Sequence, residues 1–429
     1  MNVRVLYKRR RLFLSVLAAL ALPFAFITNV FLFLALATVF ILLLMNSAQT
    51  TTEKILIAFC ASVLFSGVTV FTLRPYDIIT ILSLCYVMFK NRFSVRIYKN
   101  IIPFLIVVIV ICFINYSDDA FLEAVRYVIS MLLLVVVLNI DRCTFDELGS
   151  QFAVIGITNI IFALSTFILF TSGTLTNYTS GVINTNLYLS NREVRLFGFF
   201  SDPNKFMTFS FAMLFLVEYY MTKSRTKSLL ILIFLVSSVL SMSRTAILVI
   251  ILYLACKILR KVQKISKAAF YISVILGIFT FLFFYISDSF DELINSAYSA
   301  MAQILNREWT VSLGTTIAED NRFLIWQKAW EYIVEKPVGG YGWMSNTFLL
   351  PYPTHSTAIA LLLDGGIIAL VAFTVLFWPL FRLKCWELTI PLIYIPSLLL
   401  DLQNYRMWFL ILGLVLASRG YRKANRIEV

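Results

Sequence analysis

The chain has 429 residues, of which 60% are hydrophobic and only 14% are charged, and its mean hydropathy is +0.87. Soluble domains carry about 25% charged residues, so this composition excludes an ordinary soluble domain. The formal net charge of +13 raises the question of nucleic acid binding, which the distribution of the basic residues argues against. Apolar runs near the ~20 residues that cross a bilayer recur along the chain, and such long blocks predict helices rather than the short alternating segments of a β-barrel.

The expected fold is all-α, a polytopic transmembrane helical bundle with about fourteen spans. The candidate spans are residues 12–28, 30–45, 55–72, 77–89, 101–115, 121–139, 151–171, 204–221, 228–242, 245–259, 269–286, 357–381, 388–402 and 406–419. The ninth and thirteenth are short and the fourth is shorter still, so twelve or thirteen true spans are an alternative. No internal repeat or linker divides the chain, which predicts a single integral-membrane domain over residues 1–429.

The positions of Lys and Arg predict the orientation of this bundle, because cytoplasmic connections are enriched in them. With the N-terminus inside, more than half of the 36 Lys and Arg fall in cytoplasmic segments, namely 1–11, 90–100, 222–227, 260–267 and 419–429. Both termini are then cytoplasmic, and two long loops, 172–203 and 288–355, face outside. The second of these loops holds four basic and eight acidic residues. The excess of Lys and Arg is therefore interpreted as a determinant of membrane orientation, and no nucleic acid partner is expected.

The outer loop 288–355 has helix signals of its own. Ser289 and Glu292 have the spacing of a capping box, which predicts a helix start there. A second helix is expected to begin near Asp320 and to end at Pro337 and the glycines that follow. Its expected apolar face, typical of a helix that lies along a membrane surface, consists of Trp326, Ala329, Trp330 and Ile333.

A group of polar residues, Asp202, Pro203 and Asn204, stands at the outer end of the eighth span, and Arg195 precedes it. Asp202 can cap a helix, and Pro203 suits its first turn. The helix then directs its positive dipole end and free N–H groups outward, which favours an anion, and Arg195 adds a fixed cation. The alternative is a capped membrane helix with Arg195 in water near the interface.

Arg244 stands at the start of the tenth span, on the side that is poor in basic residues. A cation there is costly unless it is paired or lines a wet cavity. Snorkelling to lipid headgroups is the alternative.

His355 is the only histidine and stands just before the span that begins near Thr357, at the outer mouth of the bundle. A histidine imidazole is mostly neutral at pH 7 and can accept a proton. The alternative is an ordinary loop residue. Arg322, in the same outer loop, is a further cation on this side.

No paired-histidine or Cys/His metal spacing, phosphate-loop motif or Gly-x-Ser-x-Gly sequence occurs, so neither a metal nor a cofactor is expected. Acidic residues on the outer side, including Asp118 and Asp119, leave a carboxylate-bound metal open. Glu123 and Arg126 in the sixth span are interpreted as a structural ion pair, with a position lining the cavity as the alternative.

Taken in this order, the motifs resemble those of the O-antigen polymerase and O-antigen ligase superfamily of bacterial membrane glycosyltransferases. The resemblance covers about residues 150–381, and more loosely the whole chain by its number of spans. Each motif alone is weak, and their joint order makes the match specific. The residues that carry it are Arg195, Gly198, Asp202, Pro203 and Asn204; Ser243 and Arg244; Arg322, Trp326 and Ala329; Pro337, Gly339, Gly340, Tyr341 and Gly342; His355 and Ser356; and Gly365, Gly366, Ile367 and Ile368.

The resemblance implies a GT-C-like fold in the bacterial inner membrane and inverting, metal-independent transfer at the periplasmic side. Donor and acceptor would be oligosaccharides linked to undecaprenyl diphosphate, with a chain-length regulator protein as a candidate further partner. The essential basic residues of the superfamily map onto Arg195, Arg244, Arg322 and His355. We expect His355 and Arg322 to be catalytic, and Arg195, Arg244 and Asn204 to bind the diphosphate.

An O-antigen polymerase, which joins lipid-linked repeat units, is the favoured function. An O-antigen ligase, which transfers the lipid-linked glycan to lipid A-core, is the close alternative, because the donors are alike and only the acceptors differ. A lipid-linked oligosaccharide flippase or other transporter is the third candidate function. Transporters more often show two similar halves with interrupted helices, and no such repeat is present.

Overall fold

The computed structural model contains helices and no strand in the part of the chain that it describes, which confirms the expected all-α class. The described residues are 13–14, 17, 20–22, 30–48, 50–65, 74–114, 116–140, 145–171, 200, 203–222, 224–241, 243–286, 321–383, 385–402 and 405–424. For some helical residues, among them Arg244 and Arg322, the backbone alone is described. Arg195 and the helix start expected at Ser289 lie outside the described residues.

Most described helices coincide with the expected spans. They are α2 (Val30–Ser47), α3 (Thr51–Val63), α4 (Pro75–Lys90), α5 (Ile101–Ile114), α6 (Asp118–Asn139), α7 (Phe145–Thr171), α8 (Pro203–Tyr220), α9 (Arg225–Leu240), α10 (Arg244–Ile265), α11 (Lys267–Ile286), α13 (Asn321–Glu335), α14 (Ser345–Leu349), α15 (Thr357–Phe381), α16 (Trp386–Thr389), η2 (Ile390–Tyr394), α17 (Ile395–Leu399) and α18 (Arg406–Ala424).

Local chemistry accounts for several helix starts. Pro75 and Pro203 are the first residues of α4 and α8, where the missing N–H is not needed. Ser117 caps α6 because its hydroxyl accepts the N–H of Ala120 at 3.1 Å. Of these starts, Pro203 was expected from the sequence, whereas the expected spans 77–89 and 121–139 begin two and three residues after the starts of α4 and α6.

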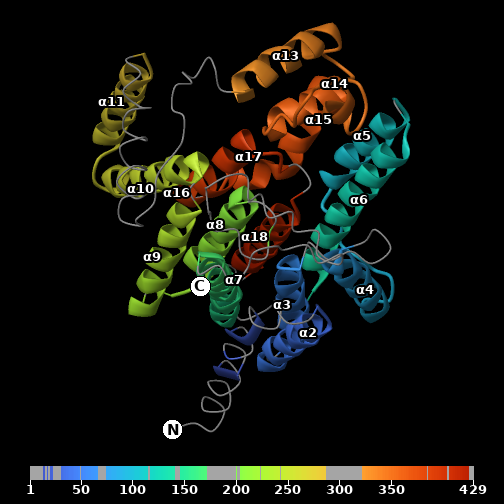
Figure 1. Cartoon of the computed structure of the whole chain (residues 1–429), viewed down its shortest axis with the longest axis vertical. Coiled ribbons are helices and arrows are strands. Elements are labelled where there is room, and N and C mark those ends of the chain that lie inside the picture. The colour runs from blue at the N-terminus through green and yellow to red at the C-terminus, as the bar shows by residue number, and fades with distance from the viewer. Residues whose placement is uncertain are drawn as a thin grey trace.

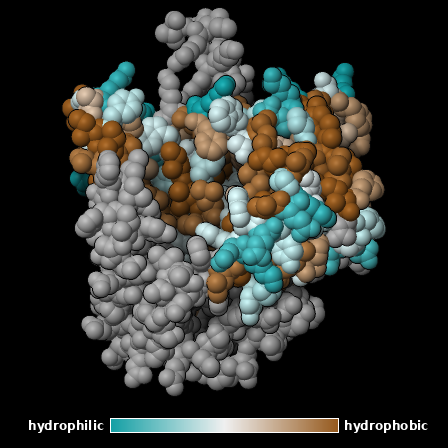
Figure 2. Space-filling model, turned by 90° about the horizontal axis from the view of Figure 1, so that it is seen from above, coloured by the Kyte–Doolittle hydropathy of each residue, from teal (hydrophilic) through white to brown (hydrophobic). Residues whose placement is uncertain are grey.

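Three described helices are long and apolar enough, by length and composition, to cross a bilayer. They are Asp118–Asn139, Leu148–Ser165 and Thr357–Phe381. Five shorter apolar helices accompany them, and hydrophobic side chains cover much of the described surface in the view of Figure 2. Exposed examples are Phe113 on α5 and Val371 on α15, at 75% and 52%. The chain is thus a helical membrane protein, and the number of about fourteen spans stays a prediction.

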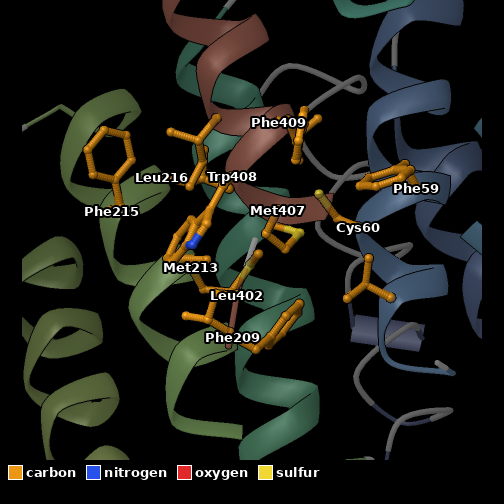
Figure 3. Packing of buried hydrophobic residues seen from close by; sticks show 14 of the residues in the cluster. Phe59, Cys60, Phe209, Met213, Phe215, Leu216, Leu402, Met407, Trp408 and Phe409 are labelled. Atoms are coloured by element: carbon orange, nitrogen blue, oxygen red, sulfur yellow. The ribbon is translucent and has the colours of Figure 1, made fainter. Parts of the chain in front are cut away.

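The helices pack around a shared apolar core. α6 contacts α4, α5 and α18, while α8 contacts α7, α9 and α18. Figure 3 shows how α8 and α18 meet, with Phe209 and Met213 facing Met407 and Trp408, and with Cys60 of α3 close by. α13, α14 and α15 lie together at one end of the molecule in Figure 1, where α13 and α14 both contact α15.

The expected span at 388–402 is present as one apolar helical run over Trp386–Leu399, and only its expected end is wrong. The run comprises α16, the π-helix η2 and α17, with helical backbone angles at both junctions, and the chain is already extended at Leu400, with φ −143° and ψ 152°. Pro391 and Pro396 lie within this run, and proline has no N–H to bond the preceding turn. Asp401, placed inside the span by hydropathy, follows the end of α17 as a consequence.

The outer-loop helix α13 begins at Asn321, next to the expected start at Asp320. Of its expected apolar face, Ala329 and Ile333 are buried and Trp330 is 58% exposed, and the contact of this face with a membrane surface stays a prediction. Ile325 takes part in the buried face instead. With Ala329 and Ile333 of the same helix, it packs against Leu350 and against Leu363 of α15 in a small separate core. The face of α13 that packs against α15 is therefore rotated away from Trp330.

Candidate functional site

Asp401 organises the backbone at the start of α15. Its Oδ1 accepts the hydroxyl of Thr354 at 2.8 Å and the N–H of Ser356 at 2.9 Å, and its Oδ2 accepts the N–H of His355 at 2.9 Å. A carboxylate that accepts three donors is a strong hydrogen-bonding centre. The segment after α17 thereby holds three consecutive residues before α15.

His355 adopts a left-handed backbone conformation, with φ at +52°. For a residue other than glycine this conformation costs roughly 1–2 kcal/mol. The bonds to Asp401 offset that cost. His355 is half-buried, and no hydrogen bond to its imidazole is found among the described residues. The fold thus fixes the backbone of His355 and leaves its ring for other contacts.

Thr357 and Leu400 add further hydrogen bonds between the start of α15 and the chain after α17. The N–H and the hydroxyl of Thr357 both donate to the carbonyl of Leu400, at 3.0 and 2.8 Å, and the N–H of Leu402 donates to the Thr357 hydroxyl at 2.8 Å. The first residue of α15 and the chain after α17 therefore form one unit, which surrounds the Asp401 contacts.

Trp326 of α13 reaches the same segment. Its indole N–H donates to the carbonyl of Thr354 at 2.6 Å, one residue before His355. Arg322 is the second residue of α13 and lies about one helical turn before Trp326. The helix that carries Arg322 is in this way bonded to the segment that carries His355.

The glycine-rich loop after α13 is bonded to a break in α15. Gly365 and Gly366 have non-helical backbone angles, so carbonyl groups in the preceding turn of α15 are available to the loop. The N–H groups of Tyr341 and Gly342 donate to the carbonyls of Leu363 and Asp364, each at 2.8 Å. The two motifs Pro337–Gly342 and Gly365–Gly366 are thus partners in space.

Glycine is required on both sides of this contact. Gly340 has φ +63° and Gly366 has φ +60°, in the region that L side chains rarely adopt. A Cβ on Gly366 would come 2.2 Å from the carbonyl oxygen of Val338, and one on Gly340 would come 2.5 Å from that of Leu363. Asp364 adds a further anchor, because its Oδ1 accepts the N–H and the hydroxyl of Ser345 at 3.0 and 2.7 Å.

Asn204 and Ser243 join the starts of α8 and α10. The Ser243 hydroxyl donates to Oδ1 of Asn204 at 2.7 Å, and Ser243 directly precedes Arg244, the first residue of α10. Asn204 is the second residue of α8. Two helix starts, each with a positive dipole end, therefore lie side by side at this point. The Asn204 amide oxygen has a structural bond that the sequence did not reveal.

A buried ion pair joins two further helix starts. The Arg406 guanidinium meets Oδ1 of Asp77 at 3.2 Å, and both side chains are 4% exposed. Arg406 opens α18, and Asp77 lies in the first turn of α4. The expected pair of Glu123 and Arg126 is also present, at 3.0 Å. Removal of one partner from a fully buried pair such as Asp77 and Arg406 typically lowers the free energy of unfolding by about 3–5 kcal/mol.

The structure thus places four of the five expected site residues in two clusters, while Arg195 lies outside the described residues. One holds His355 and the backbone of Arg322, and the other holds Asn204 and the backbone of Arg244. α17 contacts both α10 and α15, so it lies between the helices of the two clusters. Asp401 was missed as a site residue, because hydropathy assigned it to a span. Its only signal is a carboxylate at the outer end of an apolar run. Among the described residues no group of three potential metal ligands occurs.

These features define a helical membrane protein with a histidine-bearing site at the meeting point of several helix starts. Residues 229–374 match a family model described as O-antigen ligase, which supports membership of the O-antigen ligase and polymerase superfamily. The matched region runs from α9 into α15 and contains Arg244, Arg322 and His355. Among curated proteins, none matches the chain.

Proposed function

We propose that the protein is an O-antigen polymerase, an inverting glycosyltransferase that joins undecaprenyl-diphosphate-linked repeat units. The observation that carries the proposal is the bonding of His355 to Asp401 beside α13, the helix that contains Arg322. Both basic residues fall in the region that matches the O-antigen ligase family model. The proposed location is the inner membrane, with a GT-C-like fold of about fourteen spans and the active site at the periplasmic face.

The long-range contacts support the proposed grouping of the connecting segments at two opposite faces. His355 with Asp401, and Asp77 with Arg406, join segments that were all expected at the outer face. At the opposite face, the N–H of Arg96 donates to the amide oxygen of Asn139 at 2.6 Å. Arg260 lies 3.8 Å from Glu387, and both belong to segments expected inside. Segments from one expected face thus contact segments from the same face, as the proposed order of the spans requires.

The helix starts favour an anionic ligand. α8 and α10 begin side by side, and free N–H groups at such starts attract phosphate. Arg244 opens α10, and the proposal assigns it, with Arg195, Arg322 and Asn204, to the donor diphosphate. Arginine matches phosphate with a planar fork of donors, so such a set can neutralise the leaving group without a metal.

The proposed transfer is one displacement. A neutral imidazole nitrogen of His355 takes the proton of the acceptor hydroxyl, and the hydroxyl oxygen forms the new bond to the donor's anomeric carbon. The bond from that carbon to the diphosphate oxygen breaks, and undecaprenyl diphosphate leaves with the electron pair. Attack opposite the leaving group inverts the anomeric centre. General base catalysis contributes about 100- to 10,000-fold to such a step.

An O-antigen ligase is the second candidate, and the description of the matching family model favours it. The two activities share the donor and differ in the acceptor, which is a lipid-linked repeat for the polymerase and lipid A-core for the ligase. The lipopolysaccharide of a deletion mutant separates them. A core that carries a single repeat indicates the polymerase, whereas bare core indicates the ligase.

Purified protein with a defined lipid-linked repeat tests the proposal directly. A polymerase extends the repeat into a ladder without lipid A-core and without added metal. Absence of extension, together with transfer to added lipid A-core, would reject the polymerase in favour of the ligase.

A further inference from the structure

α13 is attached to the rest of the molecule in two different ways. Along its length, the small core of Ile325, Ala329 and Ile333 packs it against α15. The hydrophobic effect that drives this packing is not directional, whereas a hydrogen bond has a defined geometry. Beyond the C-terminal end of α13, the glycine-rich loop is bonded to the break in α15 at Gly366. This attachment is distant from the first turn of α13, where Arg322 lies.

Trp326 supplies the directional contact near that first turn. Its indole N–H donates to the Thr354 carbonyl at 2.6 Å. Within the described part of the chain, no other side chain of α13 hydrogen-bonds the segment 350–356. The Thr354 hydroxyl in turn donates to Asp401, which also accepts the N–H of His355. Among the described side chains of the first half of α13, Trp326 therefore makes the one hydrogen bond to the unit that holds His355.

We propose that Trp326 is a positioning residue that fixes the spacing between Arg322 and His355 through its bond to the Thr354 carbonyl. This inference rests on the proposed function, because it assumes that both basic residues act on one substrate. The phosphate group held by Arg322 and the hydroxyl approached by His355 belong to two different molecules. Their reacting atoms must meet in line, and a misplacement of about 1 Å can cost about 100-fold in rate.

The test uses Trp326→Phe, which keeps an aromatic ring and removes the N–H. Trp330→Phe is the matched control, since it is the same substitution one turn later at an exposed position. Each change is made in the wild type and in His355→Ala, and turnover and donor KM are measured with purified protein and a defined lipid-linked repeat. Trp326→Met, a long apolar side chain without an N–H, repeats the test if the phenylalanine variant does not fold.

We expect Trp326→Phe to lower kcat by about 10- to 100-fold with little change in donor KM. Trp330→Phe should match the wild type. In the His355→Ala background, Trp326→Phe should cause no further loss, because a misplaced base and an absent base are equivalent.

Wild-type turnover in folded Trp326→Phe would overturn the inference. So would an equal loss in both backgrounds, which is the result of a general loosening of the fold. Failure of the proposed function has a different signature, namely wild-type turnover in His355→Ala itself.

Discussion

Asp401→Asn is the substitution that most sharply separates the support of His355 from its chemistry. Asp401 accepts three donors, at 2.8, 2.9 and 2.9 Å. The asparagine side chain has one carbonyl oxygen, which can keep the two bonds at the Oδ1 position. Its NH₂ group then faces the N–H of His355, where two donors meet.

The expected loss follows from these contacts. An unsatisfied donor costs about 1–3 kcal/mol, and the left-handed conformation of His355 costs roughly 1–2 kcal/mol more to maintain. The His355 backbone should relax and move its ring, so we expect turnover to fall by about 100-fold. Donor KM should change little, because the proposed arginines remain.

The assay is steady-state extension of a lipid-linked repeat by purified variants, with thermal unfolding measured in parallel. Asp119→Asn is the matched control, since Asp119 is an exposed carboxylate in the first turn of α6. It should behave like the wild type in both measurements. The reasoning is refuted if folded Asp401→Asn turns over at the wild-type rate, or if its whole defect lies in donor KM.

Three further predictions concern topology, metals and the loop contact. In a background without native cysteines, Ser312→Cys should react with an impermeant thiol reagent from the periplasmic side while Ala424→Cys should not, and the reverse pattern would invert the topology. Turnover should survive EDTA, because arginines neutralise the diphosphate; loss of activity that magnesium or manganese restores would reject this role. Gly366→Ala should lower thermal stability and turnover together, since its Cβ would come 2.2 Å from the Val338 carbonyl oxygen, and a variant as stable as the wild type would contradict the described contact.

Helix positions could be predicted where local chemistry sets them. The start of α8 at Pro203 follows from proline's place in a first turn, and the start of α15 at Thr357 lies where the apolar run begins. The π-turn within the helical run from Trp386 to Leu399, and the end of that run before Leu400, were missed, because hydropathy measures transfer into lipid and ignores backbone bonding. Pro391 and Pro396 carried the signal, since neither can donate to a preceding turn.

The roles of the candidate site residues stay a prediction, and their arrangement could be predicted only in part. A lone histidine before a span is visible in the sequence, and so is the order of the basic residues. The partner of His355 is Asp401, 46 positions later in the chain, and no local pattern encodes such a contact. Likewise, the glycines after Pro337 predict a turn, but their docking on Gly366 depends on how α15 breaks. Long-range pairing of this kind needs the folded chain.

The comparison of the wild type with His355→Ala in a single-turnover assay, at saturating donor and a defined acceptor, tests the central claim most directly. The account predicts unchanged donor binding and transfer slowed by about 100- to 10,000-fold. Near wild-type transfer by folded His355→Ala, or a loss that lies entirely in donor affinity, would contradict the role of His355 as the base.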